Sequence, residues 1–140
     1  QNWESAKHKE KNRESRLDGV PISLPALTRA QRIQEKASYA GFDWKKTEQV
    51  WEKIHEEIQE LKEAQSNGNK SHIEEEIGDV IFSIVNLARF LNISAESALR
   101  KTNRKFVTRF KAVETELKNR GKEVEDSNLE EMDEIWNTVK

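Results

Sequence analysis

Apolar residues recur every three or four positions from Leu27 to the end of the chain, without the two-residue alternation typical of a strand. Short turn sequences interrupt this pattern, such as Asn67-Gly68-Asn69 and the glycines at positions 41 and 121. A chain with this pattern buries its apolar residues by packing helices against helices. The fold class is therefore predicted to be all-α, and the short connections favour antiparallel neighbours in a bundle.

Turn and capping residues divide the pattern into five predicted helices. The first ends at Gly41 and the second at the Asn67-Gly68-Asn69 turn. The third and fifth are predicted to open with capping boxes, Ser71-x-x-Glu74 and Ser127-x-x-Glu130, and the fourth with Ser94 as N-cap. The predicted ranges are 27–40, 46–66, 71–91, 95–120 and a last segment after Ser127. Residues 1–19 are expected to form a flexible arm or linker, and residues 20–140 one helical domain.

The composition excludes several classes of function. The 24 Lys and Arg residues nearly balance the 26 Asp and Glu residues, so the net charge of −2 predicts neither a nucleic-acid partner nor a membrane surface. The chain has no cysteine, which excludes disulfides and thiolate chemistry and is compatible with the reducing cytoplasm. No apolar run approaches the roughly 20 residues of a membrane span.

Because only 34% of the residues are hydrophobic, the core is thin, and we expect a homodimer or higher homo-oligomer to cover the remaining apolar surface.

Two carboxylates of the second predicted helix lie where apolar residues are expected. At about 100° per residue, Glu57 falls inside the apolar stripe of this helix, and Glu60 falls at its margin. Glu56 points further toward solvent. A carboxylate on a core-facing stripe is costly unless another group compensates its charge. The stripe itself consists of Val50, Ile54, Ile58 and Leu61, with Trp51 at its edge.

The third predicted helix carries a similar anomaly. Residues 80–91 are apolar nearly all round, which predicts a buried helix. One narrow strip of this helix is nevertheless polar, and it consists of Glu76, Asp79, Ser83 and Asn86. Because a short turn joins this helix to the preceding one, the two should pack antiparallel, and their inward acids should meet.

Four acids that meet in a half-buried site need a neutralising partner. Like charges would otherwise force some of them to take up protons. Oxygen-only ligands suit Mg²⁺, with Mn²⁺ as a substitute, so a metal site is one interpretation of Glu57, Glu60, Glu76 and Asp79. The alternative is a set of salt bridges to Lys or Arg residues of another helix.

A row of cations marks the fourth predicted helix. Lys101, Lys105 and Arg109 follow one another at four-residue spacing on one face, away from the apolar side that includes Leu99 and Phe106. Phosphate oxygens are natural partners for such a row, although solvated cationic rows are also common. Next to a carboxylate metal site, the row would complete a polyphosphate clamp. The three histidines are not expected to form a cluster of metal ligands, and the chain has no glycine-rich phosphate loop.

These acids and cations follow one another in an order that resembles the MazG family. The family signature, EExxE followed by ExxD, is matched by Glu56-Glu57-x-x-Glu60 and Glu76-x-x-Asp79. Residues 98–110 and 132–140 look like the later blocks of the family, and residues 17–44 look like the entry to the second domain of two-domain MazG proteins. The resemblance covers residues 17–140 and leads us to expect a fragment of a longer protein.

The resemblance implies an enzyme with the fold of the all-α nucleoside triphosphate pyrophosphatases, completed by dimerisation. It would hydrolyse nucleoside triphosphates to monophosphate and pyrophosphate, with broad or housecleaning specificity. Glu57, Glu60, Glu76 and Asp79 would bind Mg²⁺, and Glu56, Glu57 and Glu60 would be the catalytic residues. The implied substrate-binding residues are Asn103, Lys105, Arg109, Trp136 and Lys140.

Two other functions use the same residues without catalysis. A helical dimerisation module would pair its acids and bases across subunits, and its stability would not depend on Mg²⁺. A nucleotide sensor would bind nucleoside triphosphates without hydrolysing them. Such a sensor should lack an essential acid, and none of the acids in the resemblance is missing here.

Overall fold

The computed structural model describes residues 14–140, which form five α-helices and one short 3-10 helix with no strand among them. The all-α prediction is confirmed for this part of the chain. The chain divides into two compact units within the first turn of helix α5 (Ala95–Asn119): the first unit ends at Glu96, and the second is Ser97–Lys140. Residues 1–13, which hold most of the predicted arm, lie outside the described residues. No single helix of the described part has the length and apolar composition needed to cross a membrane. Helices α4 (Lys70–Phe90) and α5 meet these two requirements only when they are taken together.

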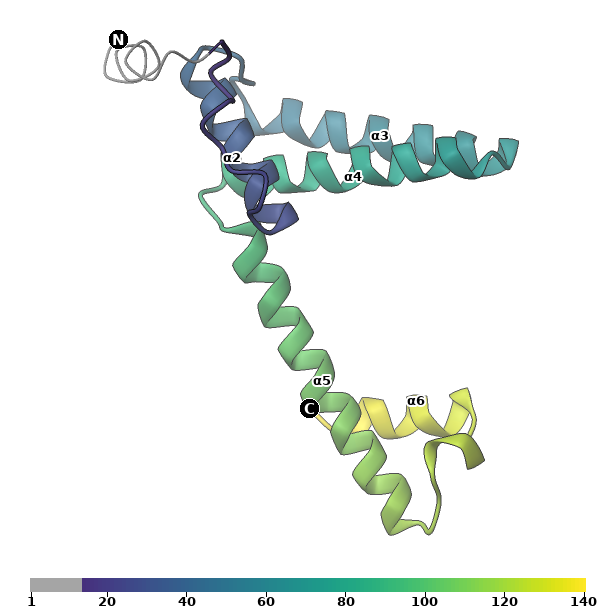
Figure 1. Ribbon diagram of the computed structural model, residues 1–140. Helices are drawn as coiled ribbons and strands as arrows, with labels where there is room; N and C mark the ends of the chain where they lie inside the picture. The colour runs from purple at the N-terminus through teal and green to yellow at the C-terminus, as the bar shows by residue number, and fades with distance from the viewer. Residues whose placement is uncertain (1–13) are drawn as a thin grey trace. The chain divides into compact units, whose positions relative to one another are not determined.

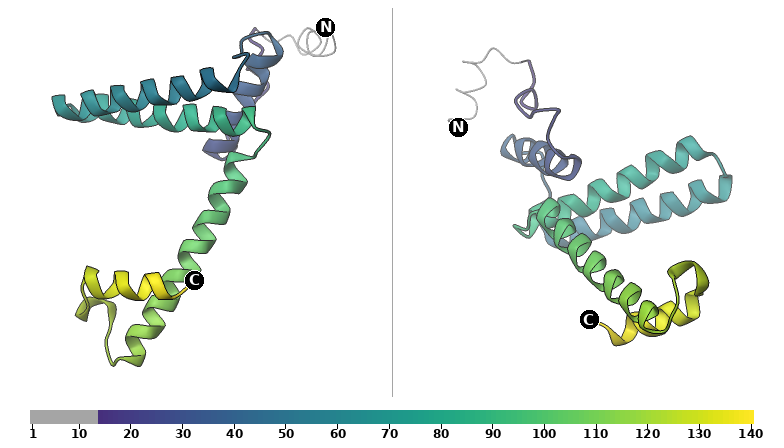
Figure 2. Two further views of the ribbon diagram at one scale, coloured as in Figure 1. Left: turned by 180° about the vertical axis from the view of Figure 1, so that it is seen from behind. Right: turned by 60° about the horizontal axis from the view of Figure 1, so that its bottom comes forward.

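A long antiparallel hairpin dominates the first unit. Helices α3 (Thr47–Asn67) and α4 (Lys70–Phe90) have 21 residues each and lie side by side along their length (Figures 1 and 2). The turn between them depends on Gly68, which has a φ of 73° and donates its N–H to the carbonyls of Ala64 and Gln65. A residue with a β-carbon is strained in this left-handed conformation, so glycine allows the chain to reverse directly after α3.

The predicted helix boundaries agree with the structure to within one or two residues, but both predicted capping boxes are wrong. Asn69 is the N-cap of α4, and its Oδ1 accepts a hydrogen bond from the N–H of His72 at 3.1 Å. In α6 (Leu129–Thr138), Asn128 accepts from the N–H of Glu131 at 2.8 Å. Asparagine caps as well as serine does. Asn69 lies two residues before Ser71, so α4 begins two residues earlier than a Ser71 cap would place it, and Asn128 directly follows Ser127, so α6 begins one residue later.

Helix α2 (Ala26–Tyr39) packs against α4 at the open end of the hairpin, away from the turn (Figure 1). The buried Gln34 donates from Nε2 to the carbonyl of Phe82 at 3.0 Å. Gln31 donates to the carbonyl of Ile93 and accepts from the N–H of Ala95, at 2.8 and 2.9 Å. These amides attach α2 to α4 and to the start of α5 (Ala95–Asn119).

The prediction that residues 80–91 form a buried helix holds only in part: Ser83 and Val85 are buried, but one apolar face of α4 is exposed. Ile77, Ile81 and Ile84 are 44%, 47% and 50% exposed, and they form one stripe at i, i+4 and i+7. Among the described residues of the first unit, α3 and α2 are the helices that pack on α4, and they leave one apolar face of α4 exposed. On the predicted stripe of α3, Val50 and Ile54 are buried, whereas Trp51 and Ile58 are exposed.

The second unit folds α5 back on α6 through Gly121 (φ 76°) and the 3-10 helix η1 (Val124–Asp126). Its core is formed by Val113, Leu117 and Ile135, each at most 1% exposed. Leu99 and Phe106, on the predicted apolar side of α5, are instead 48% and 56% exposed. The packed part of α5 is therefore its C-terminal half.

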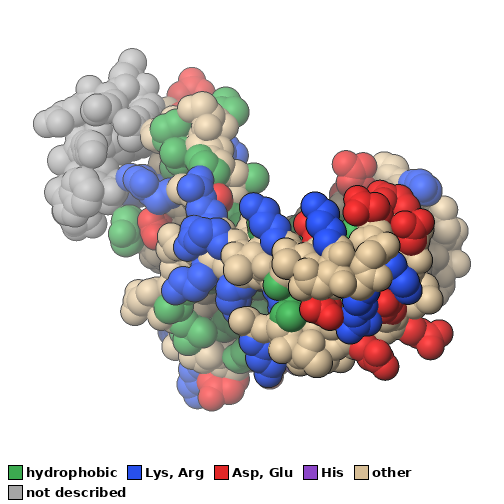
Figure 3. Space-filling view, turned by 90° about the horizontal axis from the view of Figure 1, so that it is seen from below, with side chains coloured by type: hydrophobic (Ala, Val, Ile, Leu, Met, Phe, Trp, Pro, Cys, Tyr) green, Lys and Arg blue, Asp and Glu red, His purple; other side chains and the backbone are tan. Residues whose placement is uncertain are grey.

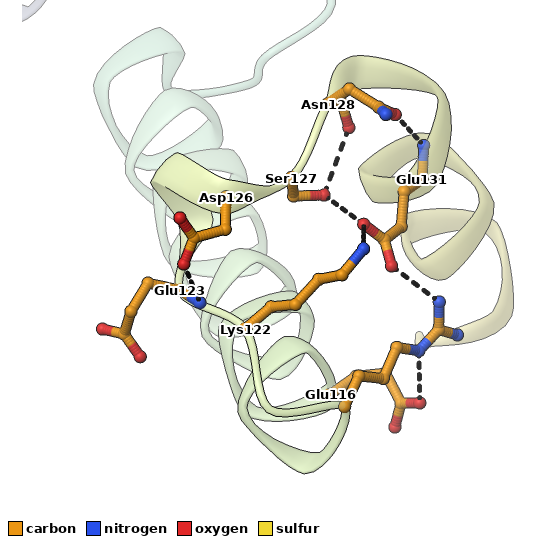
Figure 4. A network of polar contacts seen from close by, with 8 residues as sticks. Glu116, Lys122, Glu123, Asp126, Ser127, Asn128 and Glu131 are labelled. Carbon is orange, nitrogen blue, oxygen red and sulfur yellow. Dashed lines mark hydrogen bonds and ion pairs between the residues drawn. The ribbon is translucent and has the colours of Figure 1, made fainter.

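A polar network around Glu131 fixes the connection between α5 and α6 (Figure 4). Its carboxylate accepts from the Ser127 hydroxyl at 2.6 Å and pairs with Lys122 at 3.0 Å and Arg120 at 3.1 Å. Arg120 also pairs with Glu116 at 3.1 Å. The Ser127 hydrogen bond, followed by that of Lys122, lowers the pKa of Glu131 from 4.5 to about 2. The charged form of Glu131 is thus favoured in the folded chain.

Glu131 should make the stability of the chain sensitive to acid. Because its folded pKa lies below 4.5, its contribution is complete above pH 4.5 and is lost as the pH falls toward about 2. We expect Glu131→Gln to lower the melting temperature at neutral pH, with the difference from wild type closing over this interval. Thermal denaturation followed by circular dichroism between pH 2 and pH 7 measures it. Glu130→Gln, at the exposed neighbouring position, is the matched control, and a difference that persists at pH 2 would contradict the assignment.

Candidate functional site

The three acids of α3 have the exposures expected from their positions on the helix. Glu57 is buried, with 6% of its surface exposed, although it lies on an otherwise apolar stripe. Glu60 is half-buried at the margin of that stripe, and Glu56 is exposed. The ligand atoms of these three carboxylates lie within 4.8 Å of one another. The helix therefore gathers three negative charges around one buried side chain.

The acids of α4 join this group from the facing helix. Glu76 is buried, with 8% of its surface exposed, whereas Asp79 is exposed. Carboxylate oxygens of Glu57, Glu76 and Asp79 lie within 4.8 Å of one another. The predicted meeting of inward acids from the two helices is therefore observed, with Glu57 belonging to both groups.

The negative charges of the acidic cluster are only partly neutralised by the chain itself. The cluster consists of Glu56, Glu57, Glu60, Glu76 and Asp79. The negative charge of Glu57, followed by desolvation and the charge of Glu76, raises the pKa of Glu60 above 4.5. One oxygen each of Glu57 and Glu76, Oε1, is buried without a hydrogen-bond partner among the described residues. Buried carboxylate oxygens are costly when unpaired. These acids offer only oxygen atoms as ligands, and Mg²⁺ and Mn²⁺ prefer oxygen ligands.

Two basic residues that were not predicted from the sequence lie beside the acids. Lys53 Nζ lies 2.8 Å from Glu57 Oε2 and 3.4 Å from Glu56 Oε2, and His72 Nε2 lies 3.4 Å from Glu76 Oε2. The Lys53–Glu57 and His72–Glu76 contacts each join residues four apart on one helix, a spacing that is visible in the sequence. These contacts lie within α3 and within α4, so they differ from the bridges to another helix considered above. They reach only one oxygen of each buried carboxylate.

The residues predicted to bind substrate belong to the second unit. Asn103, Lys101, Lys105 and Lys140 are exposed. Arg109 is half-buried, because its Nε donates to the carbonyls of Trp136 and Val139 at 2.8 and 2.9 Å. Its guanidinium carbon lies 4.4 Å from the centre of the Trp136 ring, whose other neighbour is Phe106 at 5.1 Å. Arg109 and Trp136 thus form one structural group. Figure 3 draws Lys and Arg side chains in blue, and many of them reach the surface in this view.

An antiparallel helical hairpin with facing, partly unpaired buried carboxylates defines the class of this protein: an all-α protein with an acidic site suited to a divalent cation. Comparison with protein families agrees with this class. Residues 45–114 match the model of the MazG nucleotide pyrophosphohydrolase domain, and the chain belongs to this family. The match includes the whole α3–α4 hairpin and every residue of the acidic cluster.

Curated proteins similar to this chain are longer than it is. The chain is 50% identical over 140 residues to the "Nucleoside triphosphate pyrophosphohydrolase/pyrophosphatase MazG" of Thermotoga maritima. It is 45% identical over 143 residues to the "Nucleoside triphosphate pyrophosphohydrolase" of Escherichia coli K12. Each match covers 99% of this chain and 54% of the relative, so the chain spans about half the length of these relatives.

Proposed function

We propose that this chain hydrolyses nucleoside triphosphates to nucleoside monophosphate and pyrophosphate, with Mg²⁺ bound by the acidic cluster and with broad or housecleaning specificity. The observation that carries the proposal is the pair of buried carboxylates, Glu57 and Glu76, that face each other with one unpaired oxygen each. The names of the relatives from Thermotoga maritima and Escherichia coli support the same reaction. We place this activity in the cytoplasm.

The donor set fits a hard divalent cation. Glu57, Glu60, Glu76 and Asp79 would hold Mg²⁺, and Mn²⁺ could replace it because both prefer oxygen ligands. When bound, the cation supplies charge neutralisation of the polyphosphate and lowers the pKa of water. Binding would also satisfy the buried oxygens of Glu57 and Glu76, which lack a hydrogen-bond partner in the part of the chain that the structure describes.

A carboxylate of the cluster can take up the proton that the reaction releases. The oxygen of a water molecule forms a bond to the α-phosphorus, the bond from this phosphorus to the bridging oxygen breaks, and pyrophosphate leaves with that oxygen. The water proton passes to Glu60, with Glu56 as the alternative acceptor. Glu60 is suited to this role by its place in the cluster, since its carboxylate, with those of Glu56 and Glu57, has ligand atoms within 4.8 Å of one another and would lie close to the attacking water.

The substrate contacts that we propose rest on charge and exposure in the second unit. Lys105 and Lys140 present exposed ammonium groups, and Arg109 can offer the terminal nitrogens of its guanidinium to phosphate oxygens. Trp136 provides an aromatic face on which any base can stack, which is consistent with broad specificity. Asn103 offers an exposed amide for a further polar contact.

We further propose that the chain works as a homodimer or higher homo-oligomer. The stripe formed by Ile77, Ile81 and Ile84 leaves large apolar side chains about half exposed on α4. A contiguous apolar stripe on a helix is normally covered by another apolar surface. A second copy of the chain offers the same stripe, as required in a two-fold symmetric interface.

Release of pyrophosphate tests the proposed reaction. The purified chain is incubated with each common ribo- and deoxyribonucleoside triphosphate, in millimolar MgCl₂ and separately in EDTA. We expect Mg²⁺-dependent pyrophosphate without orthophosphate, because the bond broken lies between the α- and β-phosphates. A folded chain that releases no pyrophosphate from any nucleotide would contradict the proposal. It would favour the nucleotide-sensing or dimerisation module.

A further inference from the structure

The two buried carboxylates of the acidic cluster share one arrangement. Each has one oxygen next to a basic side chain that lies one turn earlier on the same helix. Lys53 lies 2.8 Å from Glu57 Oε2, and His72 lies 3.4 Å from Glu76 Oε2. In each case the other oxygen, Oε1, is buried and has no hydrogen-bond partner within residues 14–140. The repetition on both helices indicates a common role for the two basic residues.

That role is to restrict the rotation of the carboxylates. The terminal torsion of a glutamate side chain has a broad energy minimum, so a carboxylate without partners can turn freely. A basic group that holds Oε2 beside its own helix leaves Oε1 available to the other acids. Lys53 also contacts Glu56 Oε2 at 3.4 Å, and its pKa is raised mainly by its hydrogen bond to Glu57, so it stays protonated at neutral pH.

We propose that Lys53 and His72 are positioning residues, which orient Glu57 and Glu76 so that their free oxygens can bind the divalent cation. This inference rests on the proposed metal site. The positive charge of Lys53 would also repel a cation, but its side chain is 41% exposed, so water and salt screen this repulsion. Orientation of the nearly buried Glu57 is not screened in this way. Partners that orient metal ligands typically change metal affinity by about 10- to 100-fold.

Titration calorimetry of the full 140-residue chain with MgCl₂ alone tests the proposal without relying on turnover. We expect Lys53→Met to weaken Mg²⁺ binding by about 10- to 100-fold. His72→Leu should weaken it by about 10-fold, because the His72 contact is longer and the side chain is 45% exposed. Lys53→Arg and His72→Gln keep a donor that can reach the carboxylate, so both should bind nearly as wild type does. The matched controls are Lys62→Met and His55→Leu, at exposed positions of α3.

Circular dichroism in EDTA separates orientation from folding. The proposal requires that the weakened variants keep wild-type helix content, and His72→Leu carries the test if Lys53→Met does not fold. Unchanged Mg²⁺ affinity in folded Lys53→Met and His72→Leu would overturn the positioning role while leaving the metal site intact. Tighter binding by Lys53→Met would overturn it too, since Lys53 would then compete with the cation. A wild-type chain that binds no Mg²⁺ would instead remove the metal site itself.

Discussion

Glu57→Gln and Asp79→Asn should each abolish pyrophosphate release while leaving the chain folded. Either amide has nearly the same size as the acid it replaces, but it lacks the negative charge that a divalent cation needs. Both residues belong to the group whose oxygens lie within 4.8 Å of one another on α3 and α4. We expect turnover to fall by more than the roughly 100-fold that is typical of losing an outer partner of a metal ligand.

Measured stability distinguishes this loss of turnover from unfolding. In EDTA, Glu57→Gln removes one of several like charges that lie close together, so its melting temperature should equal or exceed that of wild type. Glu52→Gln, an exposed acid on the same helix, should retain wild-type kcat and KM and serves as the control. Wild-type turnover in either Glu57→Gln or Asp79→Asn would exclude the metal site proposed here.

Ile81→Glu should convert the proposed oligomer into monomers. Ile81 is central in the stripe between Ile77 and Ile84, so the new carboxylate would be buried without a partner in a symmetric interface. Such a charge costs about 3–5 kcal/mol, which corresponds to more than about 100-fold weaker association. Sedimentation equilibrium should give at least twice 16.3 kDa for wild type and 16.3 kDa for the variant.

The control for this experiment is a charge introduced at another exposed apolar side chain. Ile22 is 86% exposed and lies outside the helices, so Ile22→Glu should leave the mass of the assembly unchanged. A wild-type chain that sediments at 16.3 kDa throughout the micromolar range would contradict the proposed oligomer. In that case the stripe on α4 would have another partner.

Much of the fold could be predicted because turn residues punctuate a single periodic pattern. Gly41, Gly68 and Gly121 all have positive φ values, and each lies just beyond a predicted helix. Helix starts were harder to predict, since Asn69 and Asn128 compete as caps with serines one or two residues away. The exposure of α4 could not be predicted, because apolar residues all round a helix indicate burial without indicating whether the same chain provides the cover.

The site was predictable to the extent that helix geometry determines it. The position of Glu57 on an apolar stripe follows from the 100° rotation per residue, and its burial confirms that position. Lys53 and His72 could not be singled out from the sequence, because basic and acidic residues four apart are common on exposed helices. Their significance depends on the burial of Glu57 and Glu76, which only the folded structure provides.

Because α3 and α4 have the same length, they end together at one turn, and this turn is where the hairpin should tolerate an inserted peptide. Each helix has 21 residues, and Gly68 and Asn69 lie at the tip between them. Because the acids face one another through their position along each helix, a peptide spliced in at the tip would lengthen the loop and leave their alignment intact. One residue inserted between Asp79 and Ser83 would instead turn the acids of α4 by about 100° relative to the rest of that helix. The tip is therefore the natural place for a tag or a foreign domain.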